Sequence, residues 1–271
     1  MHNNLYEVLR KAPDFFLIAG PCVIETESVM LKTAEFLKEL TSELNIPFVF
    51  KSSFLKANRT SGNSYSGPGL EQGMKLLAKI KTEFELPILT DIHETNDIAA
   101  VVEICDIIQI PAFLSRQTAL LQAAGQSGRI VNIKKGQFMA PEDMLSASEK
   151  VTSTGNSKVI LTERGTTFGY HNLVVDFRGF GIMHMTGYPV VYDVTHSLQR
   201  PSESSVSGGS PEFAPLMAQA AIATGMVKGL FIETHPEPSK ALSDAGSMLA
   251  LDKLPAMLIN CIKLRQAVSQ A

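Results

Sequence analysis

Short apolar runs alternate along the chain with segments whose apolar positions recur at the spacing of an amphipathic helix. Eight of these runs end at a polar or reactive residue: FFLIAG, PFVFK, PILTD, DIIQIP, RIVNIKK, KVILTER, PVVYD and LFIETH. Because nearly every position within a run is apolar, we expect parallel strands that are buried on both faces. Eight strand-then-helix units in order predict a single (β/α)8 barrel, the TIM barrel fold of the α/β class.

The predicted units leave little of the chain unassigned, so residues 1–271 are expected to form one domain with an N-terminal extension at 1–14. Ser, Gly and Pro dominate residues 197–213, which we expect to form a mobile loop over the active site. A doubly wound open sheet shares this strand pattern, but the eight units and the lack of a strand-linked GxGxxG favour the closed barrel. Strands are expected at 15–20, 48–51, 88–91, 107–110, 130–133, 158–161, 190–193 and 230–232. Helices are expected at 28–44, 70–84, 95–103, 116–124, 142–151, 172–185, 214–224 and 247–268.

Composition narrows the class of protein. The chain has 271 residues, 45% hydrophobic and 19% charged, and one barrel needs about 250. A net charge of -3 offers no basic face, so no nucleic-acid partner is expected. No run of about 18 apolar residues predicts a membrane span, and the N-terminus lacks the apolar segment of a signal peptide. Three cysteines are an odd and sparse set, which favours a reducing cytoplasm.

Cationic side chains recur at the predicted strand ends. The carboxyl ends of barrel strands form one mouth, so these cations are expected to meet there. Like charges in a cleft repel each other unless an anion joins them, which indicates a substrate with phosphate or carboxylate groups. A single strand-end lysine is more often salt-bridged or extended toward solvent, so the prediction of an anion site rests on how many cations follow the strands. These cations are Lys51, Lys56, Arg59, Arg116, Lys134 and Arg164.

A second set of strand-end residues has the chemistry of metal ligands. Cys22, His196, Glu233 and Asp244 follow the first, seventh and eighth strands, which lie side by side in a closed barrel. A thiolate, an imidazole and two carboxylates suit a divalent transition metal. The alternatives are a small buried cysteine and a core histidine, since no close pair such as CxxC or HExxH supports the site.

Acid–base candidates also follow the strands. Asp91 and His93 lie in DIHE, and Glu163 and Arg164 lie in TERG. Asp193 and His196 lie in DVTH. Any of these carboxylates and imidazoles could transfer a proton, although Asp91 and Glu163 could equally serve only to neutralise neighbouring cations.

The loop after the second strand, residues 56–69, is polar and rich in glycine. Its Asn58, Arg59, Thr60 and Ser61 could together hold a phosphorylated sugar, and its glycines would let backbone N–H groups approach the phosphate. The alternative is a solvated loop without a ligand. The length of the loop favours the recognition role.

The motifs together resemble those of the 3-deoxy-D-manno-octulosonate 8-phosphate synthase family. The resemblance covers about residues 15 to 244 in order. It is carried by IAGPCVIE, FKSSFLKANRTS, TDIHE, IQIPAFLSRQT, VNIKKGQF, LTERGTTFGYHNLVVDFR, YDVTHSLQ and IETHPEPSKALSDA. It implies condensation of phosphoenolpyruvate with D-arabinose 5-phosphate, with release of inorganic phosphate, in synthesis of the lipopolysaccharide inner core.

The resemblance also implies roles for individual residues. The phosphoenolpyruvate site would comprise Lys51, Ser53, Lys56, Gln109, Lys134 and Arg164. The arabinose 5-phosphate site would comprise Asn58, Arg59 and Thr60, with Arg116 reaching the sugar phosphate of a neighbouring subunit in a homotetramer. The candidates for proton transfer are His196, Asp244, His93 and Lys134.

The family has a metal-dependent branch with Cys in the IAGPC position and a metal-free branch with Asn there. Cys22 therefore implies a divalent metal, which could be Mn, Co, Zn, Fe or Cd, with His196, Glu233 and Asp244 as the other ligands. The chain departs from the family where Ser210 follows Gly209 in place of a usual Arg, which places the lid contacts in question. The rival functions are a sibling synthase that uses another aldose and a non-catalytic barrel that binds sugar phosphates.

Overall fold

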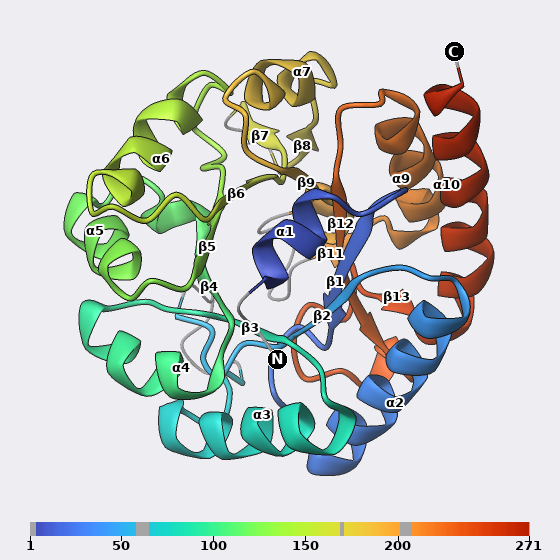
Figure 1. Ribbon diagram of the computed structural model, residues 1–271. Coiled ribbons are helices and arrows are strands. Elements are labelled where there is room, and N and C mark those ends of the chain that lie inside the picture. Colours follow the sequence, from blue (N-terminus) through green and yellow to red (C-terminus); the bar gives the residue numbers. More distant parts are fainter. Residues whose placement is uncertain (1–3, 58–64, 169–170, 201–207, 271) are drawn as a thin grey trace.

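The computed structural model describes residues 4–57, 65–168, 171–200 and 208–270. Within them, eight parallel strands form a ring in chain order, and the last pairs with the first, with Gly20 beside Glu233. Figure 1 views this ring along its axis. The predicted TIM barrel is confirmed. The strands are β1 (Phe16–Gly20), β2 (Phe48–Lys51), β3 (Ile88–Asp91), β4 (Ile107–Ile110), β5 (Ile130–Lys134), β6 (Val159–Glu163), β9 (Val190–Asp193) and β12 (Gly229–His235).

Helices surround the ring and cover its outer face (Figure 1). The apolar residues of α2, among them Met30, Ala34 and Leu37, are buried against the strands. The Thr26 hydroxyl caps this helix by accepting the Val29 N–H at 3.3 Å, so the helix begins just before the predicted residue 28. The outer helices are α2 (Glu27–Glu43), α3 (Leu70–Phe84), α4 (Ile98–Ile104), α5 (Thr118–Gln126), α6 (Asp143–Thr152), α7 (Arg178–His184), α9 (Ala214–Ala223) and α10 (Leu254–Ser269).

Shorter elements lie within the loops that connect strands and helices. The 3-10 turns are η1 (Thr95–Asp97), η2 (Ala112–Leu114), η3 (Pro211–Phe213), η4 (Pro238–Lys240) and η5 (Leu251–Lys253), and α8 (Val194–Ser197) is a single helical turn. Two antiparallel pairs join β7 (Thr166–Thr167) with β8 (Leu173–Val174) and β10 (Gln199–Arg200) with β11 (Gly208–Gly209). Part of the predicted mobile loop 197–213 lies outside the described residues, so its mobility stays a prediction.

Two predicted helices were too long. Leu173 and Val174 pair with β7, so the segment expected as helix 172–185 is helical only over α7. The last helix starts at Leu254, because β13 (Leu249–Ala250) adds to the edge of β12. The Thr234 hydroxyl donates to the Leu249 carbonyl at 2.7 Å and holds β13 there. Backbone pairing outweighs helical periodicity in both segments.

The barrel interior is apolar at one end and polar at the other. The apolar end is sealed by α1 (Leu5–Arg10), whose Leu9 is buried against the interior and which crosses the centre of Figure 1. Two residues further along each strand, on the same face, the interior becomes polar. The apolar layer comprises Phe16, Ile18, Val49, Leu89, Ile107, Ile130, Ile160, Val191 and Phe231. The polar layer includes Lys51, Asp91, Gln109, Asn132, Thr162, Asp193 and Glu233, all buried.

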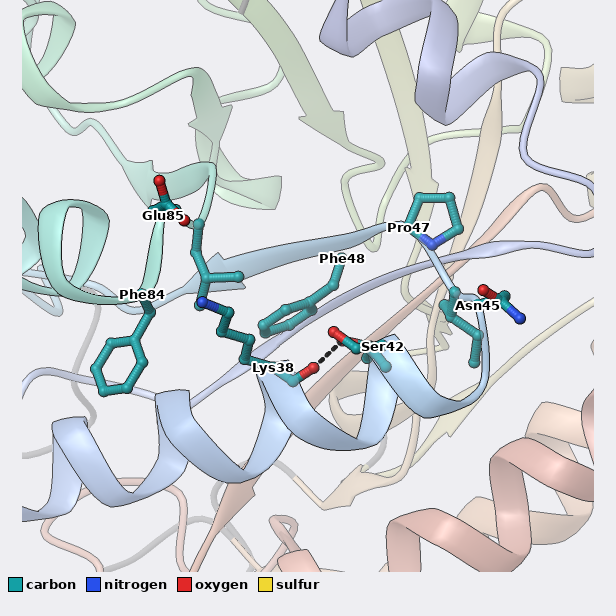
Figure 2. A pocket seen from close by; sticks show the side chains of 10 residues that line it. Lys38, Ser42, Asn45, Pro47, Phe48, Phe84 and Glu85 are labelled. Atoms are coloured by element: carbon teal, nitrogen blue, oxygen red, sulfur yellow. Dashed lines mark hydrogen bonds between the residues drawn. The ribbon is translucent and has the colours of Figure 1, made fainter. Parts of the chain in front are cut away.

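A hollow of about 450 Å³ opens at the sealed end of the barrel and not at the polar end. Figure 2 shows Phe48 and Phe84 beside it, with Pro47 and Glu85 at its edge. Phe48 is the first residue of β2, whereas Lys51 is the last. The hollow therefore lies away from the strand ends that carry the candidate chemistry.

Candidate active site

Glu233 is the centre of the polar mouth. It lies on β12 with its side chain fully buried, and its Oε1 is 2.6 Å from Lys51 Nζ and 3.5 Å from Lys56 Nζ. The same oxygen is 3.6 Å from Nε2 of His196. Burial alone would raise the pKa of Glu233, but Lys51 and Lys56 hold this pKa well below its ordinary value. The carboxylate is therefore ionised and joins cations from two elements.

The predicted metal ligands converge beside Glu233. Ligand atoms of Cys22, Glu233 and Asp244 all lie within 4.8 Å of one another. The Cys22 Sγ is 3.1 Å from Oδ2 of Asp244 and 2.9 Å from Oγ of Ser243. The Nε2 atom of His196 lies beside this group of three, 3.9 Å from the same Asp244 oxygen. Four donors that are far apart in the sequence thus face one small volume.

Three observations test whether these residues fit a divalent cation. Among the described residues, the buried Oε2 of Glu233 has no hydrogen-bond partner, an unusual state that a bound ion would relieve. Burial, followed by the charges of Asp244 and Glu233, raises the pKa of the Cys22 thiol well above its ordinary value. A thiol kept protonated by nearby anions is deprotonated when a cation binds. Asp244 also has a φ of 48°, in the left-handed region, which is common where a function constrains the backbone.

His196 is oriented by Asp193. Its Nδ1 is 2.9 Å from Oδ2 of Asp193, and its backbone N–H donates to Oδ1 at 2.9 Å. The Asp193 carboxylate accepts a hydrogen bond from Nδ1–H and so turns Nε2 toward Glu233 and Asp244. Metal-binding histidines are commonly held by a carboxylate in this way. Burial opposes the charge of Asp193, but His196 and Lys134 keep its pKa far below the ordinary value.

The remaining cations surround the same mouth. Lys134 Nζ is 2.5 Å from Oδ2 of Asp193 and 3.3 Å from Nδ1 of His196. Burial lowers the pKa of both Lys134 and Arg164. Arg164 donates to Gln199 at 3.1 Å, and its buried Nη1 lacks a hydrogen-bond partner among the described residues. Buried donors of this kind suit a multiply charged anion.

Ser53 and Gln109 lie on the opposite side of the mouth and share Asp91. The Ser53 hydroxyl donates to Oδ2 of Asp91 at 2.7 Å, and the Gln109 amide donates to Oδ1. Burial would raise the pKa of Asp91, but Lys51, Lys56 and the Ser53 hydroxyl keep it low. Both predicted phosphoenolpyruvate contacts are therefore anchored to one buried carboxylate.

Two of the other predicted residues, His93 and Arg116, fall within the described part of the chain. His93 packs edge-on against Phe54, with ring centroids 5.7 Å apart, and does not belong to the group of ligand atoms. Arg116 is exposed on the rim after β4, where its carbonyl accepts from Lys150. Asn58, Arg59 and Thr60 lie outside the described residues. Glu163 accepts the N–H groups of Arg164 and Gly165, so its carboxylate shapes the turn after β6.

A buried pair that the sequence reasoning missed supports the loop with Asp244. Oε1 of Glu25 accepts the Leu242 N–H at 3.0 Å, and its Oε2 is 3.5 Å from Nε2 of His235. The His235 Nδ1 accepts the Glu237 N–H at 2.9 Å. The sequence signal was available, since Glu25 closes IAGPCVIE three residues after Cys22, and His235 follows Glu233 in IETH.

Comparison with known proteins gives a consistent result. Residues 10–270 match the family model described as the DAHP synthetase I family. The 2-dehydro-3-deoxyphosphooctonate aldolase of Acidithiobacillus ferrooxidans is 51% identical over 245 residues, 90% of this chain and 87% of the relative. Proteins of that name from Desulfatibacillum aliphaticivorans and Legionella pneumophila are each 52% identical, over 93% and 90% of this chain and 93% and 89% of their own lengths. The chain thus belongs to the DAHP synthetase I family, among its 2-dehydro-3-deoxyphosphooctonate aldolases.

Proposed function

We propose that this protein is a 3-deoxy-D-manno-octulosonate 8-phosphate synthase, the enzyme that its relatives' name also denotes. It condenses phosphoenolpyruvate with D-arabinose 5-phosphate and water to give the eight-carbon sugar acid phosphate and inorganic phosphate. The observation that carries this function is one mouth in which buried cations adjoin a group of metal-ligand atoms. Two anionic substrates need cations to bind and orient them, and a divalent metal would supply Lewis-acid chemistry in the metal-dependent branch.

The cations bind and orient phosphoenolpyruvate. Lys134 and Arg164 take its charged groups from one side, and Lys51 and Lys56 from the side of Glu233. Gln109 adds a neutral donor from β4, and Ser53, just after β2, lies beside it on the same carboxylate. Holding the substrate by both charged ends fixes its C3 carbon toward the sugar aldehyde and leaves its C2 carbon open to water.

Cys22, His196, Glu233 and Asp244 hold a divalent metal, as in the metal-dependent branch of the family. Thiolate and imidazole donors favour Mn, Fe, Co, Zn or Cd over Mg or Ca. A metal held there would supply Lewis-acid chemistry toward the sugar aldehyde or the attacking water. His196 then serves as a ligand, which removes it as a general base because its Nε2 lone pair is used.

The chain's own residues handle the protons. As C3 of phosphoenolpyruvate attacks the aldehyde, the aldehyde oxygen becomes an alkoxide and needs a proton. Lys134 is the donor that the geometry favours, because burial lowers its pKa and Asp193 holds it in place. Water adds at C2 and gives up a proton, which we assign to the second carboxylate oxygen of Asp244. Loss of inorganic phosphate from C2 leaves the ketone of the product.

Arabinose 5-phosphate binds through Asn58, Arg59 and Thr60, with Arg116 supplied by a neighbouring subunit of a homotetramer. Exposed apolar rings near Arg116 support an interface there. Phe113 and Phe138, after β4 and β5, are 57% and 54% exposed, which is unusual for large rings unless a partner covers them.

No helix in the described part of the chain is long and apolar enough to cross a membrane. We place the enzyme in the cytoplasm, where its three free cysteines suit the reducing conditions. Its small-molecule partners are phosphoenolpyruvate and arabinose 5-phosphate, without nucleic acid.

The substrate assignment is tested by phosphate release. We expect release only when phosphoenolpyruvate and arabinose 5-phosphate are both present, because C2 loses phosphate only after C3 has formed its new bond. Mass spectrometry should find the eight-carbon sugar acid phosphate. Equal release with erythrose 4-phosphate would indicate a sibling synthase, and no release with any aldose would indicate a non-catalytic barrel.

The metal proposal is tested by exhaustive chelation and by Cys22→Asn. Chelation should reduce turnover at least a hundredfold, and Mn, Co or Zn should restore part of it. Cys22→Asn should lower the affinity for Co²⁺ and remove the thiolate-to-cobalt absorption band, while Cys105→Asn, also a buried cysteine, leaves that band in place. Full turnover after chelation would reject the metal-dependent branch.

The cross-subunit role is tested by Arg116→Ala. We expect the KM for arabinose 5-phosphate to rise about tenfold, as for loss of one charge-assisted contact, while sedimentation still reports a tetramer. The control is Arg10→Ala, an exposed arginine on α1 that pairs with Glu7. A monomeric wild-type enzyme with full activity would contradict this proposal.

A further inference from the structure

A chain of buried side-chain hydrogen bonds crosses the barrel interior from β6 to β3. The Thr162 hydroxyl donates to Oδ1 of Asn132 at 2.6 Å, and Asn132 Nδ2 donates to Oε1 of Gln109 at 2.9 Å. Gln109 Nε2 donates to Oδ1 of Asp91. Thr162 and Asn132 are fully buried, and Gln109 is 2% exposed. We call Thr162, Asn132, Gln109 and Asp91 the interior ladder.

The ladder has one direction, and Asp91 sets it. An ionised carboxylate only accepts hydrogen bonds, so Gln109 must turn its NH₂ group toward Asp91. Its carbonyl oxygen then faces Asn132, which must also present its NH₂ group. The Asn132 oxygen is left facing Thr162, whose hydroxyl donates. Each amide orientation therefore follows from the charge on Asp91 and from the donor at the far end.

The charge of Asp91 is secured by its surroundings. Burial opposes ionisation, but Lys51 and Lys56 lie near and the Ser53 hydroxyl donates to it at 2.7 Å, so its pKa is low. Both Asp91 oxygens thus have a donor. The terminal acceptor of the ladder remains charged at neutral pH, and the polarity of the ladder is fixed before any substrate arrives.

We infer that Asn132 and Thr162 are positioning residues that hold Gln109 with its amide N–H groups, and not its carbonyl, available to the bound anion. One hydrogen of Gln109 Nε2 goes to Asp91, and the second serves phosphoenolpyruvate. A reversed amide would set its carbonyl oxygen against Asp91 and the anion together. The identity of that anion rests on the proposed function, whereas the orientation of Gln109 rests on the ladder itself.

Asn132 lies one hydrogen bond from Gln109, and Thr162 lies two. Asn132 contacts Gln109 directly, and Thr162 acts only through Asn132. Thr162 pairs in the strand register with Lys134, but this pairing uses backbone groups that a side-chain substitution leaves in place. Thr162→Val keeps the shape and burial of the side chain and removes only the donor.

The test compares phosphoenolpyruvate binding in matched threonine variants, measured as the rise in Tm on adding phosphoenolpyruvate. Thr162→Val should lose most of this rise and increase the KM for phosphoenolpyruvate about tenfold, since the Gln109 hydrogen bond to the charged substrate is weakened. The KM for arabinose 5-phosphate should stay within about twofold. Thr162→Ser restores the donor and should behave like the wild type.

Thr41→Val is the control for stability. Thr41 is 3% exposed, and its hydroxyl donates to the Leu37 carbonyl at 2.7 Å within α2, away from the mouth. This variant should lower the starting Tm yet keep the full rise with phosphoenolpyruvate. An equal loss of that rise in Thr41→Val would show a general effect of destabilisation and overturn the inference.

A double-mutant cycle with Gln109→Leu tests the route of the effect. If Thr162 acts through Gln109, Thr162→Val should raise the KM for phosphoenolpyruvate no further once Gln109 is gone. Additive increases would overturn the inference, as would wild-type binding in Thr162→Val. A wild type that gains Tm with phosphoenolpyruvate but releases no phosphate would reject the proposed activity alone. A wild type with no gain in Tm would reject the anion assigned to the ladder.

Discussion

The ion pair between Lys51 and Glu233 is the interaction on which the polar mouth depends. Their charged atoms are 2.6 Å apart and both side chains are almost wholly buried. Burying either charge alone is costly, whereas a close pair can offset much of that cost. Glu233 also lies near Lys56 and His196, so a single carboxylate joins the cationic side of the mouth to the proposed metal ligands. Removing it would take the closest counter-charge from the buried Lys51.

Carboxylates at the strand ends offset the cost of burying these cations. Asp193 pairs with the charge of Lys134 and orients His196. On the side of the mouth with Ser53 and Gln109, Asp91 supplies the negative charge. Each of these carboxylates comes from a different strand and lies in the polar layer above the apolar interior. The parallel ring places them at one end of the barrel, because the strands all run in the same direction. The fold thereby keeps the buried carboxylates and cations of the mouth in contact, whereas in an unfolded chain water would solvate them separately.

Much of this arrangement could be predicted from the sequence, because polar residues that end apolar strands are conspicuous. The ranges of β2, β3, β4 and β9 were predicted to the residue. The convergence of Cys22, His196, Glu233 and Asp244 followed from the closure of the ring between β12 and β1. Metal binding itself stays a prediction.

Other features were hidden in the pattern. Because both faces of each strand are buried, the alternation that separates interior from exterior is masked. Asn132 was predicted only as a residue within its strand, and Thr162 fell just beyond the predicted strand 158–161. The pair of Glu25 and His235 joins the loop after β1 to the end of β12, a long-range contact that periodicity does not reveal. The short strands β8 and β13 form by tertiary pairing that overrides helical periodicity.

The most direct measurement is a crystal structure of the chain with Mn²⁺ and phosphoenolpyruvate, with the metal located by its anomalous signal. We expect the metal between Cys22, His196, Glu233 and Asp244, and the substrate's charged groups within hydrogen-bond distance of Lys134 and Arg164. Phosphoenolpyruvate bound away from these cations, or a metal held by other residues, would contradict the account.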